Sequence, residues 1–135
     1  MTFDLVPRTL EEQARWLDAR SGALEVVVAE AAGAVAGFAS LSPYRDRPAY
    51  RTTVEDSVYV HRDHRGTGVG RALLAEIVDV AANRGFHSVM ARIVGGHDAS
   101  IRLHRSAGFE TVGVEREVGR KFGRWLDVVV MQRLL

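Results

Sequence analysis

The chain has 135 residues, of which 47% are hydrophobic and 26% are charged, and it contains no cysteine. This size and composition predict one globular domain over residues 1–135, and they exclude a disulfide scaffold and a thiolate metal site. Eighteen basic and seventeen acidic residues give a formal charge of +1, so we expect no general binding to nucleic acid or to a membrane surface.

The N-terminal stretch, MTFDLVPRTLEEQ, lacks the basic segment and the apolar run of a signal peptide. No apolar run approaches the roughly 20 residues that span a bilayer. We therefore expect a cytoplasmic protein without a membrane segment. Leu10, Ala14 and Leu17 recur at helical spacing and predict a short amphipathic helix over 9–20. The next β-rich runs, over 25–42, are divided near Ala32-Gly33-Ala34, which predicts a hairpin.

The rest of the chain alternates between strand and helix signals. Residues 42–51, SPYRDRPAYR, have two prolines and no apolar period, so they are predicted to form a loop. Strands are predicted over 53–60, 88–94, 109–118 and 124–134. A helix is predicted after the strand 53–60, and Gly85 is expected to end it. A second, short helix is predicted over 99–107, with Asp98 as its cap and Gly108 at its end. This order predicts an α/β (α+β) fold, a single-layer mixed sheet with helices on its faces.

The most informative stretch is His64-Arg65-Gly66-Thr67-Gly68-Val69-Gly70-Arg71, at the point where a strand leads into a helix. Glycines allow the backbone to approach a ligand, and the first N–H groups of a helix have no partner within it, so together they bind phosphate. The alternative is a plain tight turn with solvated arginines. Three alternating glycines and two flanking arginines favour the phosphate site, and neither the Walker nor the dinucleotide spacing is present.

The stretch R-G-T-G-V-G at 65–70 resembles the pyrophosphate-binding motif of the GNAT superfamily of N-acetyltransferases. Two longer stretches, TVEDSVYVHRDHRGTGVGRALL and DASIRLHRSAGF, are similar to the phosphinothricin and methionine sulfone acetyltransferase branch. The resemblance covers nearly the whole chain. It implies the acyl-CoA N-acyltransferase fold, with a mostly antiparallel twisted sheet, and transfer of acetyl from acetyl-CoA to the amino group of a small acidic amino-acid-like substrate.

The resemblance assigns the cofactor contacts to three segments. In this family the strand before the glycine turn separates from its neighbour, and its backbone pairs with the pantetheine arm. The cofactor-binding residues that follow from the match are Val58, Tyr59, Val60, Arg65, Gly66, Thr67, Gly68, Val69, Gly70, Arg71, His97 and Ser100. His97 stands where relatives have asparagine, and an imidazole replaces only part of the hydrogen bonding of an amide.

Two residues match catalytic positions of the branch. Glu55 is the implied base for the substrate ammonium, directly or through a water; the alternative is an exposed strand carboxylate beside Asp56. A carboxylate with an ordinary pKa of about 4.3 needs partial burial to serve as a base. His104 is the implied donor to the leaving thiolate, and its alternative is a polar surface residue.

The arginine-bearing loop matches the segment that contacts the acidic end of the substrate in this branch. Arg45 and Arg47 are the implied partners of a carboxylate, phosphinate or sulfone, and Tyr50 the residue that closes the pocket. The alternative is a solvated loop in which Asp46 pairs with the arginines. His61 and His64 have no acidic or thiol partners at ligand spacing, so we expect no metal.

The resemblance also implies a strand and a helix before the region that begins at Thr2-Phe3. The sequence starts after these elements, so we expect a sheet without that edge strand. Its unpaired backbone groups are expected to favour a homodimer. Two further functions stay open: acetylation of a protein or peptide, which favours an open groove, and a catalytically degenerate acetyl-CoA-binding module, for which His97 is an argument.

Overall fold

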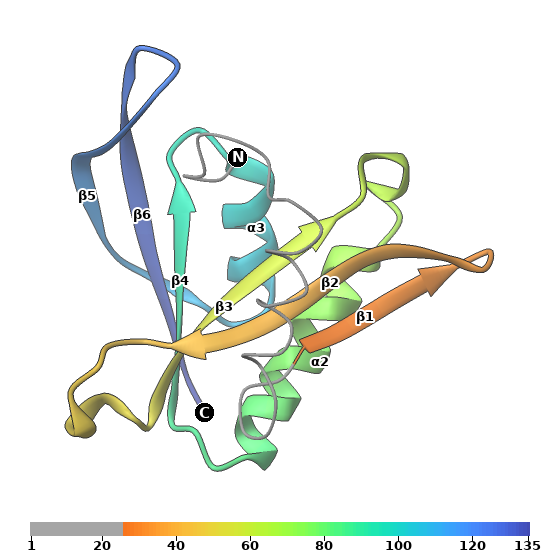
Figure 1. Cartoon of the computed structure of the whole chain (residues 1–135), viewed down its shortest axis with the longest axis horizontal. Helices are drawn as coiled ribbons and strands as arrows, with labels where there is room; N and C mark the ends of the chain where they lie inside the picture. Colours follow the sequence, from red (N-terminus) through yellow and green to blue (C-terminus); the bar gives the residue numbers. More distant parts are fainter. Residues whose placement is uncertain (1–25) are drawn as a thin grey trace.

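The computed structural model describes residues 26–135; the helix expected over 9–20 lies outside this part. Within it, six strands form one sheet in the spatial order β1-β2-β3-β4-β6-β5, in which only β3 and β4 pair in parallel (Figure 1). The predicted mixed, mostly antiparallel sheet flanked by helices is therefore confirmed. The elements are β1 (Val26–Ala31), β2 (Ala34–Pro43), η1 (Pro48–Tyr50), β3 (Thr53–Val60), η2 (Arg62–His64), α2 (Val69–Asn83), β4 (Ser88–Val94), α3 (Asp98–Ser106), β5 (Glu110–Lys121) and β6 (Arg124–Leu134).

The predicted hairpin is formed by β1 and β2, and its turn is Ala32-Gly33. Both turn residues have positive φ, 52° and 80°, as a two-residue turn that follows the twist of the strands requires. Phe122-Gly123 repeats this arrangement between β5 and β6, with φ values of 54° and 70°.

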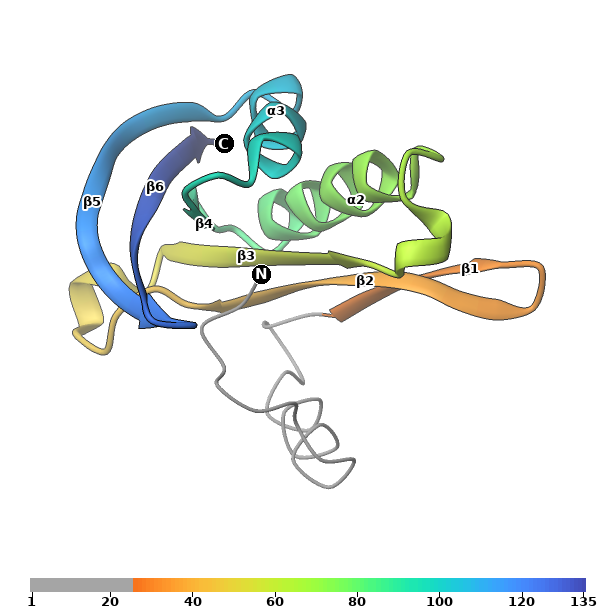
Figure 2. The ribbon, with the colours of Figure 1, turned by 90° about the horizontal axis from the view of Figure 1, so that it is seen from above.

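The two described helices lie on the same face of the sheet, as Figure 2 shows from above. Leu73, Leu74 and Ile77 of α2 are almost completely buried, and they pack on side chains of β2, β3 and β4. Phe109 follows α3 and completes the core. Neighbouring residues of a strand point to opposite faces, so every second residue of β3 and β4 faces away from the helices.

The parallel pairing of β3 and β4 is short. It joins Thr53 to Ser88, Val54 to Val89 and Glu55 to Met90, and no further pair follows. Beyond Glu55 the strands diverge, as Figure 1 shows, while β3 stays paired with β2 as far as Val60. The sheet therefore opens in its middle, directly after Glu55.

Two sequence-based boundaries are wrong. The predicted strand 109–118 extends to Lys121, because pairing with β6 continues past a bulge between Glu115 and Gly119 up to the turn. Asp98 is the first residue of α3 rather than its cap. The cap position is held by His97, whose side chain makes no capping hydrogen bond. Gly85 and Gly108 end their helices as predicted, with φ values of 85° and 89°.

Candidate active site

The glycine turn forms an open cradle at the start of α2. Gly66 and Gly68 have φ values of 75° and 88°, and a Cβ at either position would meet no atom within 4 Å. These glycines are therefore required by the backbone conformation and not by crowding. The Thr67 hydroxyl donates to the His64 carbonyl and ties the turn to η2. The first N–H groups of α2 face the open side of this turn without helical partners.

Gly70 differs from the other two in its surroundings. A Cβ on it would lie 3.4 Å from side-chain carbons of both Val60 and Leu103, in ordinary van der Waals contact, so Gly70 lies on the packed side of the turn against β3 and α3. Arg65 and Arg71, on either side of the cradle, are exposed and available to an anion. The cradle thus combines backbone donors, a helix N-terminus and two positive charges.

Val58, Tyr59 and Val60 lie in the part of β3 that has left β4. Their register partners on β2 are Ala39, Phe38 and Gly37. On the other side, the ladder between β3 and β4 has ended at Glu55. This side of β3 therefore offers backbone donors and acceptors to an extended ligand that lies between the two strands.

Glu55 stands where the strands part, on the face of the sheet away from the helices. Its side chain is 30% exposed, and Oε1 is buried without a hydrogen-bond partner among residues 26–135. Arg92 Nε lies 3.7 Å from this oxygen, too far for a hydrogen bond. Burial raises the pKa of the Glu55 carboxyl, Arg92 opposes this, and the negative charges of Asp56 and Glu115 add to it, so the net shift is upward.

His104 is buried on the opposite face, where it contacts Asp56. Its Nδ1 donates to the Ser100 carbonyl at 2.8 Å, and its Nε2 lies 3.0 and 3.1 Å from the two carboxylate oxygens of Asp56. Both side chains are only 3% exposed. Burial lowers the pKa of His104, but the hydrogen bond and charge of Asp56 and the bond to Ser100 outweigh it, so the net pKa is raised. Because both ring nitrogens face oxygen acceptors, this environment favours the doubly protonated imidazolium.

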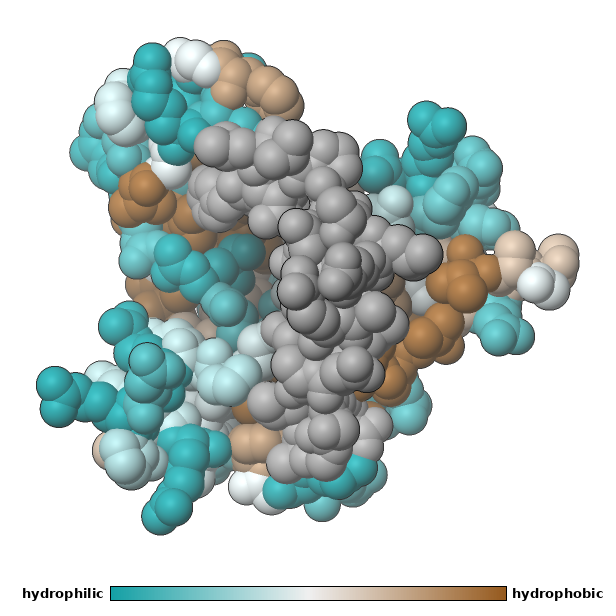
Figure 3. Space-filling view, in the orientation of Figure 1, coloured by the Kyte–Doolittle hydropathy of each residue, from teal (hydrophilic) through white to brown (hydrophobic). Residues whose placement is uncertain are grey.

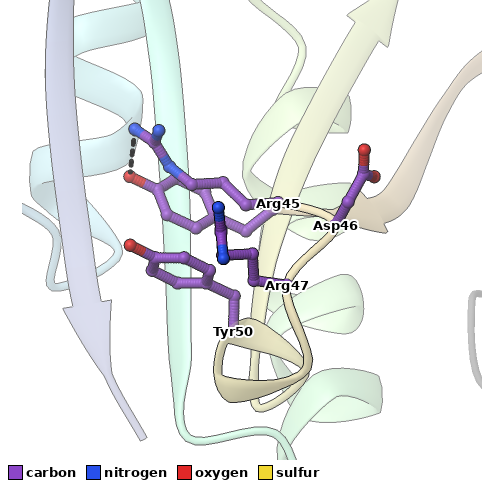
Figure 4. A pocket seen from close by; sticks show the side chains of 5 residues that line it. Arg45, Asp46, Arg47 and Tyr50 are labelled. Atoms are coloured by element: carbon purple, nitrogen blue, oxygen red, sulfur yellow. Dashed lines mark hydrogen bonds between the residues drawn. The ribbon is translucent and has the colours of Figure 1, made fainter.

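The loop between β2 and β3 forms an open pocket of about 430 Å³, lined by Tyr44, Arg45, Asp46, Arg47 and Tyr50. Figure 4 shows Arg45, Arg47 and Tyr50 side by side, with Asp46 pointing away from them. Arg45 donates to the Tyr44 hydroxyl at 3.2 Å. In the described part of the chain Asp46 makes no ion pair with either arginine, so the alternative in which it neutralises them has no contact to support it.

The pocket and Glu55 lie on the same side of the sheet. Ser42, which precedes the loop by one residue, is the register partner of Glu55 on β2. The hydrogen bond to Tyr44 is the main cause of the raised pKa of Arg45, and the charge of Glu115 on β5 makes the smallest contribution to it. Figure 3 looks onto this face, and hydrophilic side chains gather there over the loop.

The structure divides the predicted catalytic and substrate-binding residues between the two faces of the sheet. Glu55, Arg45, Arg47 and Tyr50 lie on the face away from the helices, whereas His104 lies under α3. His97 is exposed at the start of α3. The backbone carbonyl of Ser100 accepts the hydrogen bond from His104 Nδ1.

Sequence reasoning missed Asp56, Arg92 and Glu115. For Asp56 a signal existed, because strand alternation places it on the same buried face as Val54. No cluster of three or more potential metal ligands occurs within residues 26–135, and no helix there is long and apolar enough to cross a bilayer.

Three comparisons agree on one family. The model of the Acetyltransferase (GNAT) family matches residues 2–109. An L-methionine sulfoximine/L-methionine sulfone acetyltransferase of Pseudomonas paraeruginosa is 45% identical over 93% of this chain and 74% of its own length.

Two solved structures are close in shape. A phosphinothricin acetyltransferase of Sinorhizobium meliloti in complex with acetyl-CoA is 43% identical, with a TM-score of 0.95 over 99% of this chain and 74% of that one. A ribosomal-protein-alanine N-acetyltransferase of Brucella melitensis is 44% identical, with a TM-score of 0.97 over 99% and 83%. With this family match over residues 2–109, an open glycine turn before α2 and strands that separate at Glu55, the chain belongs to the GNAT family of acetyltransferases.

Proposed function

We propose that this acetyltransferase transfers acetyl from acetyl-CoA to the amino group of a small acidic amino-acid-like substrate of the phosphinothricin or methionine sulfone type. The observation that supports this most directly is the buried Glu55 Oε1, unpartnered within residues 26–135, on the same sheet face as the Arg45/Arg47 pocket. A substrate with an ammonium group and an acidic group fits a site with one carboxylate and two arginines. The names of the relatives support the same substrate class.

The described residues fit acetyl-CoA. Open space over Gly66 and Gly68, and the exposed Arg65 and Arg71, suit a pyrophosphate. The unpaired side of Val58, Tyr59 and Val60 suits an amide-containing chain that takes the place of the missing β4 ladder. Thr67, Val69 and Gly70 belong to the same cradle, and we place His97 and Ser100 at its rim on α3. When bound, acetyl-CoA supplies an acetyl group activated as a thioester.

In this proposal Glu55 is the base. Its Oε1 takes a proton from the substrate ammonium, and the amine then attacks the acetyl carbon while the carbon–sulfur bond breaks. The attacking nitrogen loses its second proton to water as the amide forms. A raised pKa makes Glu55 a better proton acceptor than an exposed glutamate. The position of Glu55 at the end of the β3–β4 pairing places this proton transfer where the strands begin to separate.

His104 is proposed as the donor to the leaving thiolate. Its imidazolium carries the required proton on Nε2, but that proton already binds Asp56. Donation to sulfur therefore requires Nε2 to exchange one partner for another. A variant with glutamine at position 104 separates the two roles, because its amide keeps a hydrogen bond to Asp56 but supplies no acidic proton.

Arg45 and Arg47 are proposed to bind the acidic end of the substrate, with Tyr50 closing the pocket. The Arg45 guanidinium lies 4.8 Å from the Tyr44 ring centre and 5.8 Å from that of Tyr50, so aromatic rings orient it. A guanidinium fixed in this way loses less freedom when it binds a carboxylate or phosphinate.

The direct test is release of CoA thiol with acetyl-CoA and a panel of amines: phosphinothricin, methionine sulfone, methionine sulfoximine, the corresponding neutral amides, and short peptides. The proposal expects turnover of the acidic amino acids, loss of most activity in Glu55→Gln, and a raised KM in Arg47→Ala.

Two outcomes of the same panel would replace the proposal. Preference for peptides would assign the chain to protein acetylation, the activity for which the Brucella melitensis relative is named. Acetyl-CoA binding without turnover of any amine would assign it to a degenerate cofactor-binding module.

We further propose that the enzyme works as a single domain in the cytoplasm, as a homodimer, without a metal and without binding nucleic acid or membranes. The near-neutral charge and the absence of cysteine support the cytoplasmic and non-nucleic-acid assignments. For the dimer, support comes from the exposed apolar side chains Val28 and Val35 on β1 and β2 and Phe122 and Trp125 on the β5–β6 hairpin. Sedimentation of the purified chain tests it.

A further inference from the structure

Three charged side chains form a line across the sheet face that carries Glu55. Arg92 on β4 lies between Glu55 on β3 and Glu115 on β5, and it is shared unequally. Its Nη2 is 2.5 Å from Glu115 Oε1, whereas its Nε is 3.7 Å from Glu55 Oε1. Both oxygens are buried and neither accepts a hydrogen bond from a described residue, so the contact with Glu115 is a close ion pair. Arg92 is therefore drawn toward the glutamate that lies farther from the separation of β3 and β4.

The spacing of the strands explains why this arrangement needs a long side chain. Strand β6 lies between β4 and β5, and Glu115 pairs in register with Val128 of β6. The Arg92 side chain must cross β6 to reach Glu115. In this position it leaves Glu55 Oε1 buried and without a hydrogen bond from any described residue.

We propose that Glu115 is a positioning residue for catalysis: it holds the Arg92 guanidinium out of hydrogen-bond contact with Glu55, which leaves Oε1 of Glu55 open to the substrate ammonium. The inference rests on the proposed function of Glu55 as the base. Without Glu115, Arg92 would be free to close on Glu55, and a charge-assisted pair would compete with proton uptake.

The charges around Glu55 support this function. They are Arg92 from β4, Glu115 from β5 and the adjacent Asp56 from β3, whereas its register partner on β2, Ser42, is uncharged. Arg92 favours the charged form of Glu55, and the two acidic neighbours oppose it. Replacing Glu115 removes one charge that raises the pKa of Glu55, and it also releases Arg92 to approach Glu55. Both effects lower the pKa of Glu55.

The experiment measures the charge of Glu55 directly. The 135-residue protein, labelled with ¹³C at the glutamate side-chain carboxyls, is titrated by NMR, and the Glu55 signal is assigned by its loss in Glu55→Gln. Glu115→Gln should lower the midpoint of the Glu55 titration, and Arg92→Gln should raise it, with Arg92→Lys in between. Glu110→Gln makes the same chemical change on the same strand and is the control.

Kinetics provide the second readout. Glu115→Gln should move the midpoint of the acid limb of the pH profile to lower pH, by the small amount expected from half-exposed charges. At a pH where Glu55 is fully charged, the same variant should lower kcat, because Arg92 then occupies Oε1. Arg92→Gln should move the acid limb to higher pH.

Two results would overturn the inference. One is a Glu55 titration that is unchanged, or moved to higher pH, in Glu115→Gln. The other is an Arg92→Gln variant that changes only KM for acidic substrates and leaves the Glu55 titration in place, which would make Arg92 a substrate ligand. If the titrations move as expected but Glu55→Gln keeps full turnover, the control of Glu55 by Glu115 is supported and the base function of Glu55 fails.

Discussion

Replacement of Asp56 by asparagine should destabilise the protein, and the size of the effect should depend on pH. In the wild type the carboxylate accepts from His104 Nε2 at 3.0 Å in a site that is 3% exposed. Unit charges at that distance attract by roughly 5 kcal/mol at an effective dielectric constant of about 20, and desolvation offsets part of this. Breaking a buried pair usually costs about 3–5 kcal/mol.

The free energy of unfolding of the asparagine variant should fall by less than that, by about 2–3 kcal/mol below pH ~6.5. The reason is that the His104 imidazole can lose a proton in the variant, so no unpaired charge stays buried. Nδ1 keeps its proton for the Ser100 carbonyl, and the neutral Nε2 accepts from the new amide. The folded-state pKa of His104 is raised, so the stability it contributes is complete below the unfolded pKa and is lost as pH rises through the folded pKa. The difference between wild type and variant should therefore shrink to about 1 kcal/mol at high pH.

Urea unfolding followed by circular dichroism, at about pH 6 and about pH 9, measures both differences. Asp79→Asn is the matched control, since Asp79 is exposed on α2, and it should change stability by less than about 0.5 kcal/mol at either pH. The reasoning would be refuted by a wild type whose stability rises between the two pH values, or by an Asp56→Asn variant that differs from wild type equally at both.

Other predictions test the cradle, the sheet and the pocket. Gly68→Ala should cost about 1–2 kcal/mol in urea unfolding, because its φ is 88°, and should raise the KM for acetyl-CoA. Gly37→Ala places a Cβ 2.4 Å from the Tyr59 carbonyl oxygen and should cost more than about 2 kcal/mol, with a lower thermal midpoint as the readout. Because the pKa of Glu55 is raised, the acid limb of kcat/KM should lie above the ordinary range of glutamate and disappear in Glu55→Gln. Arg45→Ala should raise KM about tenfold for an acidic amino acid but not for its neutral amide.

The local features of this fold could be predicted from the sequence because their causes are local. The β1–β2 turn follows from Ala32-Gly33, and the helix ends follow from Gly85 and Gly108. Strand bounds were right where a turn or a change of periodicity marked them, as at Thr53 and Val60. They failed at the end of β5, where pairing with β6 holds polar residues in a strand that periodicity alone would not extend.

The contacts of the proposed active site could be predicted only in part, because they join residues that are distant in sequence. Glu55 and His104 followed from a resemblance, but nothing local shows that His104 meets Asp56, 48 residues earlier in the chain. The Arg92–Glu115 pair likewise depends on the order in which the strands lie, with β6 between β4 and β5. Strand order is a property of the folded sheet, so the electrostatics of Glu55 could not be worked out before it was known.

The neighbouring carboxylates Glu55 and Asp56 show how one strand serves two faces of the sheet. Alternation sends Asp56 to the buried face, where it fixes the imidazolium of His104 under α3, and sends Glu55 to the open face beside the arginine pocket. An ordinary sheet would separate the two faces completely. Here the β3–β4 pairing ends directly after Glu55, so the strands separate beside the two carboxylates. An acetyl thioester in that opening would have the proposed base on one side and the proposed proton donor on the other, which is why we connect the short β3–β4 pairing to catalysis rather than to stability.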